Sequence, residues 1–151
     1  MDIKNALNKA RHICSKREKC INDIRLKLKE WDINENNQDE IINILVDEKY
    51  IDELRYARAF VHDKLHFNKW GKIKISYHLK MKGIKESIVN RILYEINPEA
   101  YKKVLTEILQ EKLNSLKNKN KAEIRQKLIS FAYNRGFSFE ESNEVVGRLI
   151  S

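Results

Sequence analysis

The segment Ile75-Ser76-Tyr77-His78-Leu79-Lys80-Met81-Lys82-Gly83-Ile84 contains a pattern that occurs three times in the chain. Residues 75–79 begin and end with an apolar residue, and Gly83-Ile84 follows after three further positions. Residues 24–28 precede Asp32-Ile33, and residues 128–132 precede Gly136-Phe137, with the same spacing. Glycine readily adopts the left-handed conformation that often ends a helix, aspartate tolerates it, and the next apolar residue folds back on the last turn. The sequence therefore predicts three equivalent helices with equivalent ends.

A further amphipathic helix is predicted after each of these ends. Its apolar positions have the i, i+1, i+4, i+5 spacing of one helix face. Ser138 with Glu141 has the form of a capping box, and Asn37 with Glu40 resembles one, which predicts helix starts there. The apolar positions are Ile41, Ile42, Leu45 and Val46, then Ile88, Val89, Ile92 and Leu93, and finally Val145, Val146, Leu149 and Ile150.

Each copy of the pattern is also expected to open with a helix. Asp52, and Asn97 before Pro98, are suitable N-caps for the second and third opening helices. Four glycines and one proline are too few for the turns of a β-sandwich or barrel. We therefore predict an all-α fold of three tandem three-helix, helix-turn-helix-like repeats, at residues 1–50, 51–97 and 98–151. Each repeat is too small for a strong core alone, so we expect an elongated array, straight or curved.

Charge is distributed unevenly along this basic chain of net charge +8. Residues 64–85 contain seven lysines and no acidic residue, and Phe67, Trp70 and Tyr77 lie among them. Residues 35–53 carry seven acidic residues and one lysine. Lysines attract a polyanion because neutralised phosphates release condensed counterions. The basic segment therefore indicates a nucleic-acid partner, with a merely solvated lysine-rich surface as the alternative.

The position of the charge favours contacts to a nucleic-acid backbone over base reading. Helix-turn-helix proteins read bases with the last helix of three, but in the first repeat this helix is acidic. Positive charge lies mainly on the second helices and the connections before them, which suits a groove that follows phosphates. Asn90-Arg91 leaves sequence-specific binding open, and Trp70 either stacks on a base or closes an edge of the core. The candidate contact residues are Lys64, Lys69, Trp70, Lys72, Lys74, Lys80, Lys82, Lys117, Lys119, Lys121, Arg125, Lys127 and Arg135.

No sequence pattern points to catalysis, a cofactor or a membrane. The motifs G-x-G-x-x-G, G-x-S-x-G, H-E-x-x-H and the Walker loop are missing, so we expect no enzyme activity and no cofactor. His62 and His66 lack the further ligands of a metal site, and Cys14 and Cys20 are expected to be reduced thiols. Residues 1–5 have no apolar signal segment, and no apolar run approaches the roughly 20 residues of a membrane span. We expect a cytoplasmic monomer.

Four stretches, taken in order, resemble the RecX family of regulatory proteins. The resemblance implies three tandem three-helix repeats, the same architecture that the periodicity predicts. It also implies binding to RecA and to its filament on single-stranded DNA, and inhibition of recombinase, ATPase and coprotease activity without a cofactor. The stretches are Lys16-Arg17-Glu18-Lys19-Cys20, Asp52-Glu53-Leu54-Arg55-Tyr56-Ala57-Arg58-Ala59-Phe60, Trp70-Gly71-Lys72-Ile73-Lys74-Ile75 running into Leu79-Lys80-Met81-Lys82-Gly83-Ile84, and Arg135-Gly136-Phe137-Ser138-Phe139.

Two positions depart from the family pattern, and two other functions stay open. Cys20 stands where the family usually has serine, and Asp32 stands where it has glycine. A DNA-binding protein with helix-turn-helix-like modules and no role with RecA would prefer a particular duplex sequence. A pure protein–protein adaptor would show no salt-dependent binding to nucleic acid.

Overall fold

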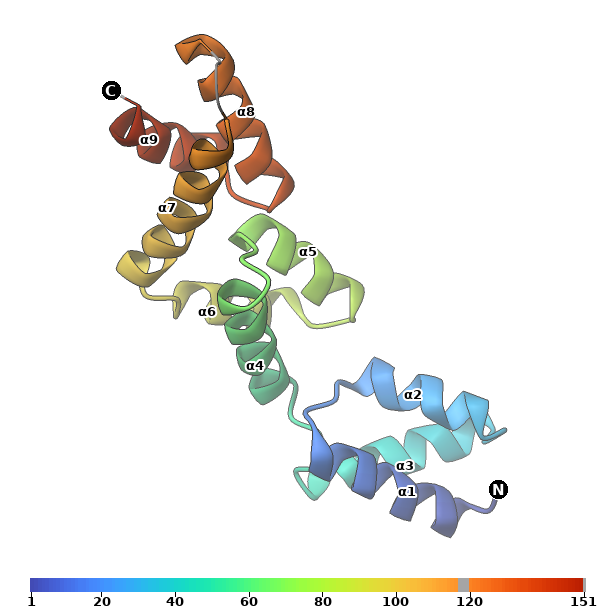
Figure 1. Ribbon diagram of the computed structural model, residues 1–151. Coiled ribbons are helices and arrows are strands. Elements are labelled where there is room, and N and C mark those ends of the chain that lie inside the picture. Colours follow the sequence, from blue (N-terminus) through green and yellow to red (C-terminus); the bar gives the residue numbers. More distant parts are fainter. Residues whose placement is uncertain (117–119, 151) are drawn as a thin grey trace. The chain divides into compact units, whose positions relative to one another are not determined.

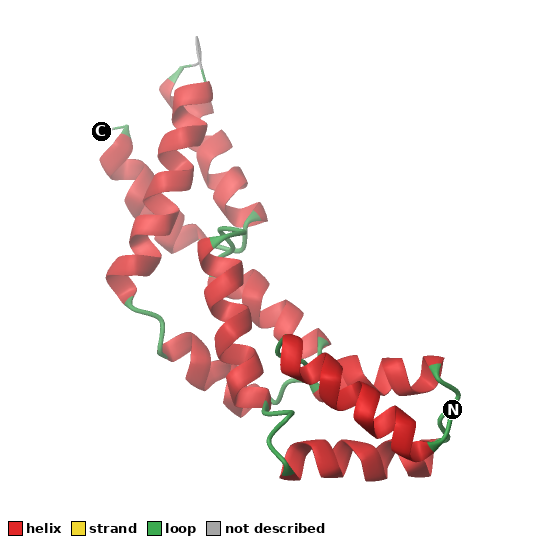
Figure 2. Cartoon of the chain, turned by 60° about the horizontal axis from the view of Figure 1, so that its bottom comes forward, coloured by secondary structure: helices red, strands yellow, loops and turns green. Residues whose placement is uncertain are grey.

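The computed structural model describes residues 1–116 and 120–150. Within these ranges every regular element is an α-helix, as predicted (Figure 2). The helices are α1 (Ile3–Lys16), α2 (Ile21–Glu30), α3 (Glu35–Asp47), α4 (Glu53–His66), α5 (Lys72–Met81), α6 (Glu86–Tyr94), α7 (Pro98–Ser115), α8 (Lys121–Asn134) and α9 (Phe139–Leu149).

The chain divides into two compact units. Residues 1–60 and 79–90 form the first unit, and residues 61–78 and 91–151 form the second. The chain crosses from one unit to the other within α4, within α5 and within α6. All three helices of the second predicted repeat therefore contribute to both units.

In the first unit, α1 and α2 both pack against α3 (Figure 1). Each helix contributes one apolar face to a shared core. The core includes Ala6 and Ala10 from α1, Ile24 and Leu28 from α2, and Ile41, Ile42 and Leu45 from α3. Small side chains on α1 allow its backbone to lie close to the larger residues of the other two helices.

In the second unit, α7, α8 and α9 pack against one another (Figure 1). The side chain of Phe137, between α8 and α9, is fully buried, and its ring centroid lies 5.2 Å from that of Tyr101 on α7. Leu128 and Ala132 of α8 are also fully buried. The third copy of the repeated pattern thus supplies the centre of this core.

The three predicted helix ends are confirmed by their backbone geometry. Asp32, Gly83 and Gly136 have φ values of 57°, 81° and 96°, in the left-handed region. The N–H of the apolar residue that follows donates to the carbonyl five positions earlier, which is the bonding of a Schellman motif. These bonds are Ile33 to Leu28 (3.0 Å), Ile84 to Leu79 (3.1 Å) and Phe137 to Ala132 (3.1 Å).

Most predicted helix starts are confirmed, and one is wrong. Asp52 accepts from the N–H of Arg55 at 3.0 Å, Asn97 caps α7, and Ser138 begins α9 with the predicted capping box. For α3, the predicted start at Asn37 is wrong because the N-cap is Asn34. Its side chain accepts from the N–H of Asn37 at 2.9 Å, so the helix begins almost one turn earlier.

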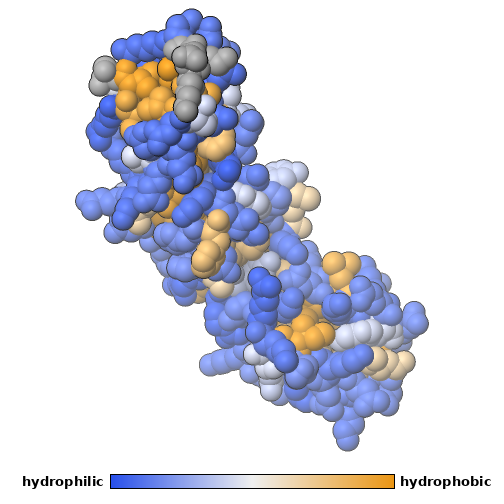
Figure 3. All heavy atoms as spheres, in the orientation of Figure 1, coloured by the Kyte–Doolittle hydropathy of each residue, from blue (hydrophilic) through white to orange (hydrophobic). Residues whose placement is uncertain are grey.

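The surface view shows a largely hydrophilic face on which apolar areas are separate from one another (Figure 3). Among the residues that the structure describes, no helix has both the length and the apolar character needed to cross a membrane.

Candidate nucleic-acid interface

In the second unit, three predicted contact residues form one cluster around an indole ring. Trp70 lies between α4 and α5, and the Nζ atoms of Lys64 and Lys74 lie 4.8 and 4.7 Å from the centroid of its ring. The imidazole of His78 lies 4.6 Å away, centroid to centroid. Cations at such distances from a tryptophan ring are held by its quadrupole. We call Lys64, Trp70, Lys74 and His78 the Trp70 cluster.

The end of α4 brings these residues together. Lys69 has a left-handed backbone, with φ 57°, and the N–H of Trp70 donates to the carbonyl oxygen of Lys64 at 2.9 Å. This turn folds Trp70 back onto the last turn of α4, where Lys64 lies. Lys74 and His78 come from α5, four residues apart and therefore on one helix face.

The charge of the Trp70 cluster comes from its lysines. Burial lowers the pKa of His78, and the nearby Lys74 and Lys64 lower it further. An imidazole with a lowered pKa is neutral at neutral pH. The cluster therefore presents two ammonium groups and an uncharged imidazole.

A second cluster, in the third predicted repeat, also has two cations at one aromatic ring. The ring of Phe131 on α8 has Lys112 Nζ at 5.3 Å and the Arg135 guanidinium carbon at 5.0 Å from its centroid. Lys112 comes from the last turn of α7, as Lys64 comes from the last turn of α4. We call these three residues the Phe131 cluster. Arg135 Nη1 also donates at 3.1 Å to the carbonyl of Asn68, two residues before Trp70.

Another predicted contact residue, Lys72, is held by Tyr101. Its Nζ lies 4.8 Å from the centroid of the tyrosine ring, and its backbone N–H donates to the phenolic oxygen at 2.9 Å. The phenol in turn donates to a carboxylate oxygen of Glu141 at 3.4 Å. Burial raises the pKa of Tyr101, so the hydroxyl stays protonated and the contact persists at physiological pH.

Two other predicted contact residues, in the first unit, have carboxylate partners. Lys82 Nζ lies 2.9 Å from Asp23 Oδ1, and Lys80 Nζ lies 3.9 Å from Glu86 Oε1. Burial raises the pKa of Asp23, but hydrogen bonds from Lys82 and from the N–H of Cys20 outweigh it, so the net pKa is lowered. Each of these two lysines therefore shares its charge with a carboxylate.

The remaining predicted residues have varied surroundings. Lys69 is half-buried, Lys121 and Lys127 are exposed on α8, and Arg125 donates to the amide oxygen of Asn143. Lys117 and Lys119 lie outside the described residues.

The site prediction lacked Lys112 and Phe131. Phe131 could have been found from the repeat, because its distance from Gly136 is the same as that of His78 from Gly83.

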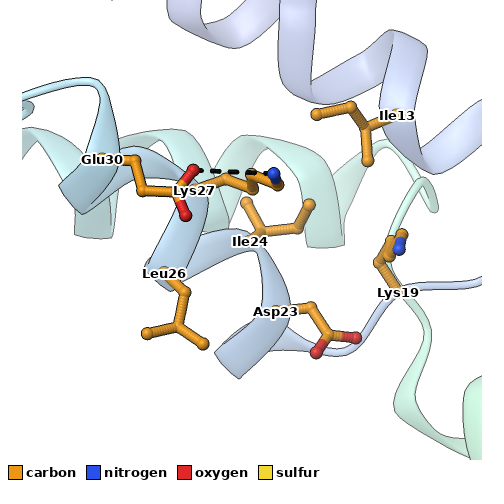
Figure 4. A pocket seen from close by; sticks show the side chains of 7 residues that line it. All are labelled: Ile13, Lys19, Asp23, Ile24, Leu26, Lys27 and Glu30. Atoms are coloured by element: carbon orange, nitrogen blue, oxygen red, sulfur yellow. Dashed lines mark ion pairs between the residues drawn. The ribbon is translucent and has the colours of Figure 1, made fainter.

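Hollows on the first unit are lined by a mixture of apolar and charged side chains and not by cations around an aromatic ring. One, of about 210 Å³, is lined by Ile13, Ile24 and five other residues, and the Lys27–Glu30 ion pair of 3.5 Å lies at its edge (Figure 4). This is smaller than the 300 Å³ or more of typical ligand pockets. In a second hollow, of about 410 Å³, Asp52 and Glu53 already accept from backbone N–H groups of Arg55 and Ile21.

No group of three or more metal-ligating side chains occurs in residues 1–116 and 120–150. His62 and His66 do approach each other on α4, with ring centroids 4.8 Å apart.

Comparison with known proteins identifies the relatives of this chain. Residues 52–93 match the family model of the second three-helix domain of RecX, and residues 100–146 match that of the third. The regulatory protein RecX of Clostridium acetobutylicum is 33% identical over 150 residues, which cover 97% of this chain and 69% of the relative. That of Clostridium beijerinckii is 33% identical over 138 residues, covering 90% of this chain and 62% of the relative.

Solved structures show the same fold. The crystal structure of RecX from Lactobacillus salivarius has a TM-score of 0.88 at 22% identity and covers 97% of this chain and 96% of its own. A second crystal structure of regulatory protein RecX has a TM-score of 0.86 at 24% identity and covers 95% of this chain and 70% of its own. The chain spans between 52% and 69% of the length of the curated relatives it matches. The chain belongs to the RecX family of regulatory proteins.

Proposed function

We propose that this chain binds RecA and the RecA filament on single-stranded DNA, and that it inhibits recombinase, ATPase and coprotease activity. The family supports a regulatory role, and the aromatic-held cations of the second unit support contact with a polyanion. The proposed regulator acts in the cytoplasm as a monomer, without catalysis or a cofactor.

The single observation that carries the DNA part of this proposal is the composition of the Trp70 and Phe131 clusters. In each cluster two cations lie over one aromatic ring. One cation comes from the first helix of a predicted repeat, and the other comes from the second helix or its C-cap. A ring restricts a flexible cation without neutralising it, so less conformational entropy is lost when a phosphate binds.

The acidic residues of α3 support a separate contact with protein. Glu35 and Glu40 are exposed on this helix, whereas Asp39 pairs with Arg25, and the C-cap residue Glu48 pairs with Arg11. Exposed carboxylates suit a basic protein surface and repel DNA. A filament repeats such surfaces, so several weak contacts to neighbouring protomers would add up through effective concentration.

The test is the ATPase rate of RecA on single-stranded DNA, titrated with this protein at fixed salt. We expect inhibition below one molecule per RecA protomer, and weaker inhibition by the Lys64→Glu/Lys74→Glu variant at unchanged helicity. The Lys4→Glu/Lys9→Glu variant makes the same change of net charge at two exposed positions of α1 that are not predicted contacts. It is the control and should inhibit like the wild type. Full inhibition by the charge-reversed protein would refute the assigned role of the Trp70 cluster.

The second candidate is DNA binding without RecA, because the same clusters would also hold bare DNA. It predicts tight, salt-sensitive binding to DNA, a preferred duplex sequence, and an unchanged RecA ATPase rate. A preference among random duplexes, together with that unchanged rate, would favour this candidate over the proposed one.

A further inference from the structure

Helix α5 carries apolar side chains on its exposed face as well as on its buried face. Ile75 is fully buried, as expected for the inner face. Ile73 and Tyr77, one helical turn apart, are 55% and 60% exposed. A helix that packs against a core normally has polar residues on its exposed face. Core packing therefore does not explain why Ile73 and Tyr77 are apolar.

The equivalent helix of the third predicted repeat has no such face. Aligning Ile75 with Leu128 places Gln126 and Ser130 at the positions of Ile73 and Tyr77, and both are exposed. In the first repeat the equivalent residues are Asn22 and Leu26. Of the three equivalent helices, only α5 therefore has an aromatic ring at this exposed position, and the fold does not require one there.

The ring of Tyr77 lies directly beside the Trp70 cluster. Its centroid is 5.4 Å from that of His78, with the two planes at 89°, so the imidazole supports the tyrosine ring edge to face. Lys74 lies three residues before Tyr77, on the same helical face. An exposed aromatic ring and a lysine ammonium therefore neighbour each other within one turn of α5.

We infer that Tyr77, with Ile73 beside it, stacks on an unpaired base of a DNA strand whose phosphates contact Lys74 and the neighbouring lysines. This inference rests on the proposed function and names the part of the filament that the site binds. Unpaired bases offer an open face for stacking, whereas the bases of a duplex are already stacked. The substrate class is therefore single-stranded nucleic acid.

The surroundings of Tyr77 favour a nucleic acid over a protein partner. Residues 64–85 hold seven lysines and no carboxylate, and lysine is depleted in protein–protein interfaces. A positive groove with an aromatic stacking platform is typical of single-strand binding. Trp70 is a weaker candidate for stacking because Lys64, Lys74 and His78 already lie against its ring. Its role is to position the two lysines.

The test measures binding of the whole protein to a fluorescent oligothymidylate and to an abasic strand of equal length. Tyr77→Ser introduces the residue found at this place in α8, and Tyr77→Phe keeps the ring. Tyr133→Ser is the matched control, because Tyr133 on α8 in the same unit is 67% exposed. Helicity measured by circular dichroism verifies that each variant is folded.

We expect Tyr77→Ser to weaken binding to oligothymidylate about tenfold, the usual size of one base–aromatic stack. The slope of affinity against salt should stay unchanged, because no phosphate contact is lost. Tyr77→Phe and Tyr133→Ser should bind like the wild type. On the abasic strand, wild type and Tyr77→Ser should bind equally.

Two results would overturn the inference. Equal binding of oligothymidylate by wild type and Tyr77→Ser would show that no base stacks on this ring. An equal loss on the normal and abasic strands would show that Tyr77 contacts the backbone. The RecA ATPase assay separates these results from the proposed function. If Tyr77→Ser binds DNA normally but no longer inhibits RecA, the ring contacts protein, and the inference fails while the proposed function stands.

Discussion

The backbone N–H of Gly71 donates to the carbonyl oxygen of Arg135 at 2.7 Å, so the start of α5 meets the end of α8 backbone to backbone. The N–H of Ile73 donates to the carbonyl of Gly136 at 3.0 Å in the same contact. A Cβ atom on Gly71 would lie 2.4 Å from the carbonyl carbon of Gly136. The second and third predicted repeats can therefore approach this closely only while residue 71 has no side chain.

Gly71→Ala is expected to destabilise the second unit by about 2 kcal/mol, because the opposing atoms are backbone and cannot rotate away. Urea unfolding followed by circular dichroism measures this loss. Gly147→Ala is the control. A Cβ there would have no neighbour within 4 Å, and alanine is favoured by roughly 0.5–1 kcal/mol over glycine inside a helix. Equal stability of Gly71→Ala and wild type would show that the two helix ends can separate at little cost.

Asp32→Gly is expected to stabilise the first unit by about 0.5–1 kcal/mol. Asp32 holds the left-handed conformation that Gly83 and Gly136 hold at the equivalent ends, and a residue with a Cβ is strained there. The midpoint of thermal unfolding should rise for Asp32→Gly. Asp32→Ala, which keeps a Cβ but loses the polar side chain, serves as the control and should lower the midpoint. A lower midpoint for the glycine variant would mean that the Asp32 side chain contributes more than its backbone strain costs.

The fold could be predicted from the sequence because its signals are local. Each helix end depends on a glycine or aspartate and the next apolar residue, and the capping box of Ser138 depends on a residue three positions away. The wrong start of α3 also concerns a local signal. Asn34 and Asn37 are both suitable N-caps by residue type, and in the structure Asn34 is the one that caps the helix.

The partner that each lysine contacts could not be predicted, because it depends on contacts between residues far apart in the sequence. Lys82 meets Asp23 from another predicted repeat, whereas Lys74 meets Trp70. Both lysines looked alike in a run without acidic residues. Charge segregation along the sequence therefore located the basic region, and the tertiary contacts determine which of its cations meet a carboxylate and which lie over an aromatic ring.

Lys74→Gln is expected to lower the salt dependence of oligothymidylate binding by about 0.7 in the slope of log affinity against log salt, the loss of one phosphate contact to a single strand. Lys9→Gln makes the same change in net charge and is the matched control. Lys9 also lies over a tryptophan, with its Nζ 5.1 Å from the Trp31 ring, but in the first unit. An equal change of slope in both variants would indicate that only net charge matters, against a localised phosphate site.

His78→Phe is expected to reduce the loss of stability on acidification, and it introduces the residue that α8 has at this position. The pKa of His78 is lowered in the folded protein by burial and by Lys74 and Lys64, so the unfolded chain takes up a proton first. The free energy of unfolding must then fall as the pH drops below about 6.5, the ordinary pKa of histidine, and level off below the lowered pKa. Urea unfolding at pH 7.5 and pH 5.5 should show a smaller difference for His78→Phe than for the wild type. The pKa of His66 is lowered by burial, His62 and Lys69, so part of the pH dependence should remain in His78→Phe and should become smaller again in the double variant with His66→Gln. An undiminished difference in His78→Phe would mean that the imidazole accepts a proton in the folded Trp70 cluster as readily as in the unfolded chain.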